Sequence, residues 1–251
     1  TIAIIVVHFA GLPCEMNKIS KFCKKKNIKI IEDSAETLGA KINGKYTGSF
    51  GIGCFSFFPT KNITTTEGGM LTTENKKVYD YVKKLIAHGI DKNIKRKFWH
   101  RVAVLPGHNF RMPNHLAAIG YSQLKRIEKF NHARNRIANL YNSELSKPFY
   151  KINIPFIPKG FTHSYQMYTI TVNAKIRDKL LYFLKKNNIE ASAHFDPPLH
   201  SQKYLKKYYK KKLPVTEKLS KEIITLPIFP DMTKKEVFYV IKTINRFIKN
   251  I

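Results

Sequence analysis

The chain has 251 residues, of which 43% are hydrophobic and 12% aromatic, which is enough apolar side chain to bury a core and argues against intrinsic disorder. Its formal net charge of +28 suggests a nucleic-acid-binding protein, but the basic residues are spread along the whole length and no recognised nucleic-acid-binding motif occurs. The three cysteines have no Cys-x-x-Cys spacing, and no apolar run approaches the ~20 residues of a membrane helix, so we expect a soluble, cytoplasmic protein without disulfides or metal.

The first predicted element is a strand over residues 2–7, where apolar and mostly β-branched residues follow one another without interruption. We expect this strand to be buried on both faces, and because a domain rarely opens in this way, we expect further residues of the same domain before Thr1. Apolar residues then recur at helical spacing over 13–26, and a second strand is expected over 28–31. Strand, helix and strand in this order imply a parallel sheet.

Polar residues follow both predicted strands. In open parallel sheets ligands bind beyond the carboxyl ends of the strands, where His8 follows the first strand and Asp33 the second. A lone histidine is more often structural than catalytic, and Asp33 alone is equally suited to cap a helix. Glycines between positions 39 and 53 predict a turn-rich crossing to strands over 54–57 and 70–73.

The second half begins with helical patterns and ends in a smaller unit. Helices are predicted over 76–88 and 113–145, with Pro113 in the first turn of the second helix and a basic, irregular loop over 91–108 between them. A strand, helix, strand and helix then follow over 167–172, 175–186, 189–193 and 234–248. This succession predicts a carboxyl-terminal α+β domain of ordinary size.

The densest basic run, KKYYKKK over 206–212, interleaves lysine with tyrosine. It is predicted to be a solvated loop or helix end, with the binding of a phosphate chain as the alternative. His163, His194 and His200 do not have the spacing of a metal triad, so no metal site is expected.

Several segments share a pattern with one enzyme family. They are IEDSAETLGA (31–40), GSFG (48–51), CFSFFPTKN (54–62) and EGGM (67–70), followed by HG (88–89), GHNFRM (107–112) and LPIFPDMT (226–233). Over essentially its whole length the sequence resembles the pyridoxal-phosphate-dependent nucleotide-sugar aminotransferases of the DegT/StrS type. Thr66 departs from the pattern because glycine is usual there, and Val6 stands where proline is common.

The resemblance implies the α/β fold of the aspartate aminotransferase type (fold type I), with a mainly parallel central sheet and a smaller carboxyl-terminal α+β domain. The expected domains are a large domain that binds pyridoxal 5'-phosphate (PLP) over 1–125, amino-terminally incomplete, a connecting long helix over 126–147 and a small domain over 148–251. The part expected before Thr1 would hold the cofactor phosphate in a glycine-containing turn at a helix start.

The resemblance also implies roles for single residues. Lys61 corresponds to the lysine that forms the Schiff base with PLP and moves the substrate proton, and Asp33 to the carboxylate that keeps the pyridine nitrogen protonated. Ser56 is similar to the serine that hydrogen-bonds the phosphate, and Asn109 to an asparagine that reaches the phosphate from the second subunit of a homodimer. Glu36 stands near the ring, where glutamine or histidine is frequent. The alternatives are that Lys61 is an ordinary surface lysine and that Ser56 only stabilises a turn.

The function that these residues imply is transfer of an amino group from L-glutamate to a keto group of a nucleotide-diphosphate-linked deoxysugar, through pyridoxamine phosphate, in amino-sugar biosynthesis. Lys61 favours this reaction over that of the related sugar dehydratases, in which the lysine is replaced. The alternatives that stay open are a truncated homologue that has lost cofactor binding, a fragment of a longer enzyme, and a basic nucleic-acid-binding protein.

Overall fold

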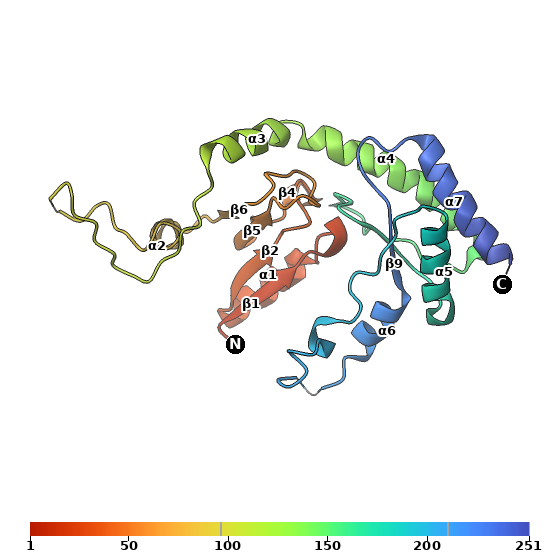
Figure 1. The fold of residues 1–251 in the computed structure, drawn as a ribbon. Coiled ribbons are helices and arrows are strands. Elements are labelled where there is room, and N and C mark those ends of the chain that lie inside the picture. Colours follow the sequence, from red (N-terminus) through yellow and green to blue (C-terminus); the bar gives the residue numbers. More distant parts are fainter. Residues whose placement is uncertain (96, 210, 251) are drawn as a thin grey trace. The chain divides into compact units, whose positions relative to one another are not determined.

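The computed structural model describes residues 1–95, 97–209 and 211–250 (Figure 1). The chain folds as two compact units, of which the first comprises Thr1–Phe9 and Pro13–Ile127 and the second Ala10–Leu12 and Glu128–Ile251. Among the described residues, no helix combines the length and the apolar character that crossing a bilayer requires.

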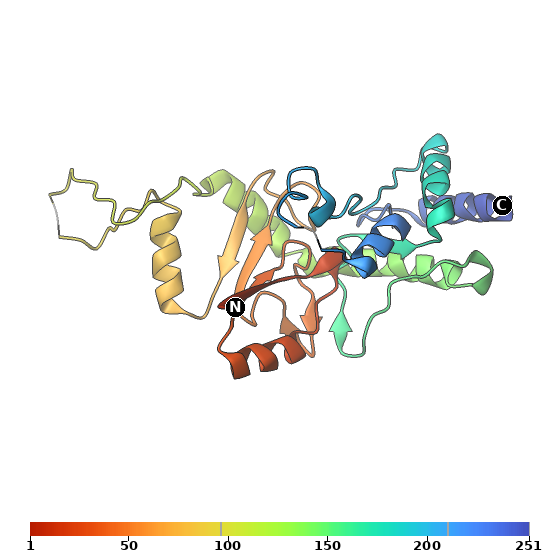
Figure 2. The ribbon, with the colours of Figure 1, turned by 90° about the horizontal axis from the view of Figure 1, so that it is seen from below.

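The centre of the first unit is a four-stranded sheet. Its strands stand in the order β1 (Ala3–Val7), β2 (Lys29–Asp33), β5 (Ile52–Ser56) and β6 (Gly69–Thr72). The first three run parallel, and β6 pairs antiparallel with β5. Helix α1 (Met16–Lys26) connects β1 to β2, so the predicted strand–helix–strand unit is confirmed (Figure 2).

Strand β1 lies at the edge of this sheet, and one of its faces is open. Ile5 is 66% and Val7 54% exposed, whereas Val6 between them is buried. Successive side chains of a strand point to opposite faces, so Ile5 and Val7 share the face that no described element covers. The prediction of a strand buried on both faces is therefore wrong for the described residues.

The other elements of the first unit lie around the sheet. A short antiparallel pair, β3 (Lys41–Ile42) and β4 (Lys45–Tyr46), interrupts the crossing from β2 to β5. Helix α2 (Lys76–Leu85) begins at Asn75, whose side-chain oxygen accepts hydrogen bonds from the first backbone N–H groups, and it ends earlier than predicted.

The single helix predicted over 113–145 is in fact two helices, α3 (Asn114–Leu124) and α4 (Ile127–Leu145). Pro113 precedes the first helical residue in an extended conformation instead of lying in the first turn. The helix breaks where the backbone N–H of Arg126 donates to the carbonyl of Gln123 at 2.9 Å, a tightened turn of the kind that closes helix ends.

The second unit packs helices on one antiparallel strand pair, β8 (Tyr168–Thr171) and β9 (Ile223–Leu226). Helix α5 (Ala174–Lys186) lies against β9, α6 (Pro214–Glu222) and α7 (Lys234–Lys249), as Figure 1 shows. The short elements are η1 (Phe9–Gly11), η2 (Pro148–Tyr150), β7 (Phe161–Thr162) and η3 (Leu199–Ser201). One continuous apolar cluster fills the unit, with Tyr141, Leu184 and Ile244 at its centre.

In this unit a strand was predicted over 189–193 and a solvated loop or helix end over 206–212. No strand occurs over 189–193, because only Ser192 pairs there, in an isolated bridge with Thr225. The lysine-rich run over 206–212 is exposed and forms no helix at its described positions, as predicted for a solvated loop; Lys210 lies outside the described residues.

Candidate functional site

The carboxyl ends of β2 and β5 bring Asp33 and Ser56 onto one face of the sheet. Asp33 is the parallel partner of Cys54, and Ser56 follows Cys54 by two positions, so all three side chains share that face. The Asp33 Oδ1 atom accepts a hydrogen bond from the backbone N–H of Ala35 at 3.1 Å. Asp33 and Ser56 are both half-buried, so a carboxylate and a hydroxyl lie within reach of a ligand at this sheet end.

The thiol of Cys54 offers no reactive group at this site. Burial, and then the negative charge of Asp33, raise the pKa of the Cys54 thiol. The thiol therefore stays protonated at neutral pH and is a poor nucleophile.

A turn after β5 places Lys61 next to Glu36. The backbone N–H of Lys61 donates to the carbonyl of Phe58 at 3.0 Å, and the Lys61 Nζ atom lies 3.5 Å from the Glu36 Oε1 atom. The two side chains are 17% and 15% exposed, so their contact is largely shielded from solvent. The structure thus joins two residues from separate segments of the predicted site.

Asn109 lies apart from this group in its described contacts. It follows α2, forms an isolated antiparallel bridge with Ala87 and is exposed. Its side-chain oxygen accepts a hydrogen bond from the Arg111 Nε atom at 3.2 Å. The described hydrogen bond of Asn109 therefore leads to a neighbour in sequence and not to Lys61 or Asp33.

The turn between Lys61 and β6 explains one departure from the family pattern. Thr66 has a φ of 65°, in the left-handed region, where a residue with a Cβ atom is strained and glycine is not. Gly68, two residues on, leaves no room for a side chain, because a Cβ atom would lie 2.6 Å from the Thr65 Oγ1 atom. The turn thus retains glycine where packing demands it and carries backbone strain at Thr66.

Sequence reasoning did not identify the role of one residue beside the site. Glu32, which directly precedes Asp33, is fully buried, and His8 contacts it at 3.1 Å. Nothing local distinguishes a buried acid at the end of an apolar run, because its partners lie far away in the sequence. The pairing of His8 with Glu32 gives this histidine a described structural partner.

The groups at this sheet end match the chemistry of PLP. Lys61 provides a primary amine for an aldehyde, Asp33 an anion for a protonated ring nitrogen, and Ser56 a donor for a phosphate oxygen. Among the described residues, no group of histidine, cysteine or acidic side chains is arranged to hold a metal ion.

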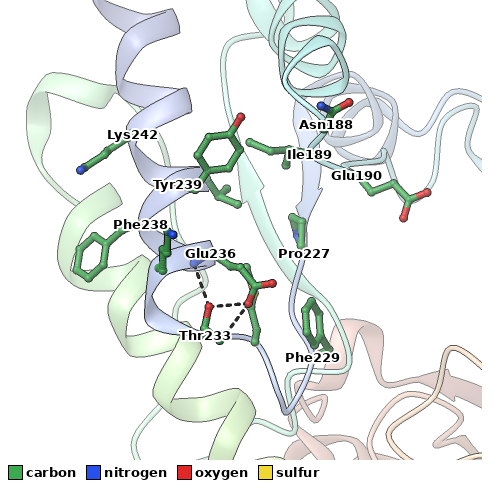
Figure 3. A pocket seen from close by; sticks show the side chains of 13 residues that line it. Asn188, Ile189, Glu190, Pro227, Phe229, Thr233, Glu236, Phe238, Tyr239 and Lys242 are labelled. Carbon is green, nitrogen blue, oxygen red and sulfur yellow. Dashed lines mark hydrogen bonds between the residues drawn. The ribbon is translucent and has the colours of Figure 1, made fainter.

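The second unit contains a separate pocket of about 1210 Å³ (Figure 3). Ile189, Pro227 and Phe229 contribute apolar surface to it. Figure 3 shows that Thr233 and Glu236 hydrogen-bond to each other, because they form the capping box at the start of α7. Lys235 and Lys242 also line the pocket, but its Thr233 hydroxyl and Glu236 carboxylate are engaged with each other in the helix cap.

Comparison with known proteins places the chain among the aminotransferases. The model of the DegT/DnrJ/EryC1/StrS aminotransferase family matches residues 1–245. GDP-perosamine synthase of Escherichia coli O157:H7 is 37% identical over 253 residues, which cover 98% of this chain and 66% of that protein.

Solved structures show the same relationship. Helicobacter pylori PseC, an aminotransferase involved in the biosynthesis of pseudoaminic acid, has a TM-score of 0.92 at 26% identity, over 100% of this chain and 68% of its own. A putative sugar aminotransferase from Streptococcus pneumoniae, solved in a PLP form and a PMP form, has TM-scores of 0.85 and 0.86 at 25% identity, over 99% of this chain and 68% of its own. The chain therefore spans about two thirds of the length of the proteins that it matches.

Proposed function

The chain belongs to the DegT/DnrJ/EryC1/StrS aminotransferase family, and we propose that the protein moves an amino group from L-glutamate to a keto group of a nucleotide-diphosphate-linked deoxysugar. The likeness to solved aminotransferases confirms the predicted α/β fold of the PLP-dependent transferases, and PLP is the cofactor of the family. The nucleotide part of the proposed substrate is supported by the relative named GDP-perosamine synthase.

The observation that carries the proposal is the position of Lys61. Its amine lies in a shielded contact with Glu36, three residues after Asp33, and Lys61 itself follows Ser56 by five positions. A lysine used only for solubility would extend into solvent, as Lys18 does with 81% of its side chain exposed. Retention of the lysine also supports transamination over sugar dehydration.

We assign each group one task in the reaction. Bound PLP supplies an electron sink for the carbon that loses a proton. The Lys61 Nζ atom would hold PLP through its aldehyde and, when free, would move a proton between the substrate carbon and the cofactor carbon. The Glu36 carboxylate accepts a hydrogen bond from Lys61 Nζ and so orients the amine.

The remaining groups hold the cofactor. The Asp33 carboxylate keeps a proton on the ring nitrogen, and the Ser56 hydroxyl donates to the phosphate. Asn109, which is exposed in the described chain, is proposed to reach the phosphate of a second subunit, so that a homodimer builds each site. We also propose the domain division predicted from the sequence: a large domain over 1–125, which contains this sheet end, a connecting helix over 126–147 and a small domain over 148–251.

The test is a spectroscopic titration of the natural protein with PLP. We expect a visible band from the lysine-bound cofactor, bleaching of that band by L-glutamate, and loss of both signals in Lys61→Ala. Lys84→Ala is the matched control, because Lys84 also contacts a carboxylate, that of Asp91 at 3.1 Å, but has no assigned role. A wild-type protein that binds no PLP would contradict the proposal.

A further inference from the structure

Glu32 is a fully buried carboxylate to which the proposed reaction gives no task. Its Oε1 atom accepts hydrogen bonds from the backbone N–H groups of Phe50 at 2.6 Å and Gly51 at 3.0 Å. Its Oε2 atom accepts from the backbone N–H of Gly48 at 2.9 Å and contacts the His8 Nε2 atom at 3.1 Å. Four donors thus surround the two oxygens, which is what makes a buried carboxylate tolerable.

The hydrogen-bond pattern assigns the proton on His8. The backbone N–H of Cys14 donates to the His8 Nδ1 atom at 3.1 Å, so Nε2 carries the hydrogen and donates it to Glu32. Burial raises the pKa of Glu32, but the hydrogen bonds from His8, Gly48 and Phe50 outweigh burial and hold the pKa below its ordinary value. Glu32 is therefore an anion at neutral pH.

The contacts of Glu32 connect all four strands of the sheet. His8 directly follows β1, Glu32 belongs to β2, and the turn from Gly48 to Gly51 leads into β5. The Thr72 Oγ1 atom, on β6, donates to the carbonyl of Gly48 at 2.7 Å. Removing the carboxylate would free the turn that sets the lateral positions of these strands.

The network acts close to the proposed cofactor site. Glu32 and Asp33 are neighbours on β2, so their side chains point to opposite faces of the sheet. The backbone N–H of His8 donates to the carbonyl of Asp33 at 3.1 Å, and that of Ser34 donates to the carbonyl of Cys54 at 2.8 Å. A shift of Glu32 would thus be passed through the backbone to Asp33.

We propose that Glu32 and His8 are positioning residues for the site, which hold the strand ends so that the Asp33 carboxylate and the Ser56 hydroxyl meet the cofactor together. This inference rests on the proposed function. A carboxylate that only stabilised the fold would change unfolding without a specific effect on the cofactor.

The experiment compares Glu32→Gln with Leu184→Ala in the natural protein. Glutamine keeps the shape of the side chain but turns an amide NH₂ toward N–H donors, whereas Leu184→Ala empties part of the core of the second unit and leaves the network intact. At a temperature at which circular dichroism shows both variants folded, we expect the PLP dissociation constant to rise at least tenfold in Glu32→Gln and less than twofold in Leu184→Ala. The turnover number should fall in Glu32→Gln by more than the KM for glutamate changes.

A second pair of variants tests the network even if Glu32→Gln does not fold. Glutamine at position 8 can donate to Glu32 and accept from Cys14, so His8→Gln should retain PLP affinity within threefold. His8→Leu can do neither and should lose tenfold or more.

The outcomes separate the two proposals. If wild-type protein binds PLP and Glu32→Gln and His8→Leu bind it as tightly, the positioning role is overturned and the proposed function stands. If wild-type protein does not bind PLP, the proposed function fails and the positioning role fails with it.

Discussion

The two units are held together by different kinds of interior. In the second unit, buried apolar and aromatic side chains far outnumber the buried polar ones among the described residues, and most of them form one cluster around β8 and β9; the buried polar ones are Arg134, His163, Ser164, Gln166, Arg177, Ser220, Thr225 and Thr243. In the first unit, buried polar side chains are as common among the described residues as buried apolar ones: His8, Glu32, Ser34, Thr37, Thr47, Asn62 and Thr65 stand against Val6, Met16, Cys23, Ala40, Ile42, Phe57 and Ile63.

This difference suggests that the second unit mainly stabilises the fold, whereas the first unit positions the functional groups. Burial of apolar surface is strong but non-directional, and it suits a unit that must only hold its shape. Hydrogen bonds are directional, and they suit a unit that must set the positions of an amine, a carboxylate and a hydroxyl. The proposed site accordingly lies in the unit whose interior has the larger share of polar side chains, and substitutions in both units test that contrast.

The largest effect is expected from truncation of the second unit's core. Leu184 is fully buried in α5, so Leu184→Ala should lower the free energy of unfolding by roughly 2–5 kcal/mol through lost burial and the cavity left behind. Leu219 on α6 is 45% exposed, and Leu219→Ala should cost far less. Urea unfolding of both variants measures the difference, and equal losses would contradict an apolar core as the main support of this unit.

The next largest effect is a loss of stability of the second unit at acidic pH, caused by His163. Burial lowers the pKa of His163 to about 3, so this histidine is neutral when folded. The unfolded chain takes up a proton near pH 6.5 and the folded chain only near pH 3, so the stability due to His163 is complete above pH 6.5 and is lost progressively as the pH falls. At pH 5 the loss amounts to about 2 kcal/mol.

His163→Asn tests this prediction, because an asparagine oxygen can replace the His163 Nδ1 atom that accepts from the backbone N–H of Tyr165 at 2.9 Å. Unfolding curves between pH 7 and pH 5 should be flatter for the variant than for the wild type. The same pH dependence in both proteins would show that His163 does not control acid sensitivity.

The sequence alone predicts the features that depend on neighbouring residues, and it fails for those that depend on contacts between residues far apart in the chain. The strand–helix–strand unit and α7 follow from local periodicity and capping, and both were predictable. The four-residue strand β9 was not, because a short apolar run does not distinguish strand from helix, and only its pairing with β8 decides. The break between α3 and α4 likewise falls within an uninterrupted helical pattern.

For the candidate site too, the sequence identifies residues within motifs but not the contacts between distant segments. Lys61, Asp33 and Ser56 were accessible because they stand in motifs, but the contact of Lys61 with Glu36 joins two segments whose distance no motif gives. The network of Glu32 was invisible because three of its four donors are backbone groups of a distant turn, which any residue type can supply.

A smaller effect is expected in the turn after Lys61. Thr66→Gly should raise the free energy of unfolding by about 1 kcal/mol, because the left-handed backbone of Thr66 costs a residue with a Cβ atom that amount. Thr73→Gly, at a position without positive φ, should instead lower stability. Thermal unfolding of both variants measures the two signs, and a loss in Thr66→Gly would show that the hydroxyl of Thr66 outweighs the strain.

The smallest effect on stability is expected from Glu36→Gln. Its described contact with Lys61 is long, at 3.5 Å, so loss of the charge should change the free energy of unfolding by less than about 1 kcal/mol. Glu32→Gln should cost several times more, since its amide NH₂ would face two of the four donors of this buried carboxylate. Similar costs for the two glutamates in urea unfolding would remove the distinction between them.

The central claim, that Lys61 carries the chemistry, is tested most directly by finding the lysine to which the cofactor binds. The natural protein is incubated with PLP and reduced with borohydride, and its peptides are mapped by mass spectrometry. We expect the phosphopyridoxyl mass on the peptide that contains Lys61, and its absence from that peptide when L-glutamate is added before reduction. Label distributed over other lysines, with none on Lys61, would contradict the claim.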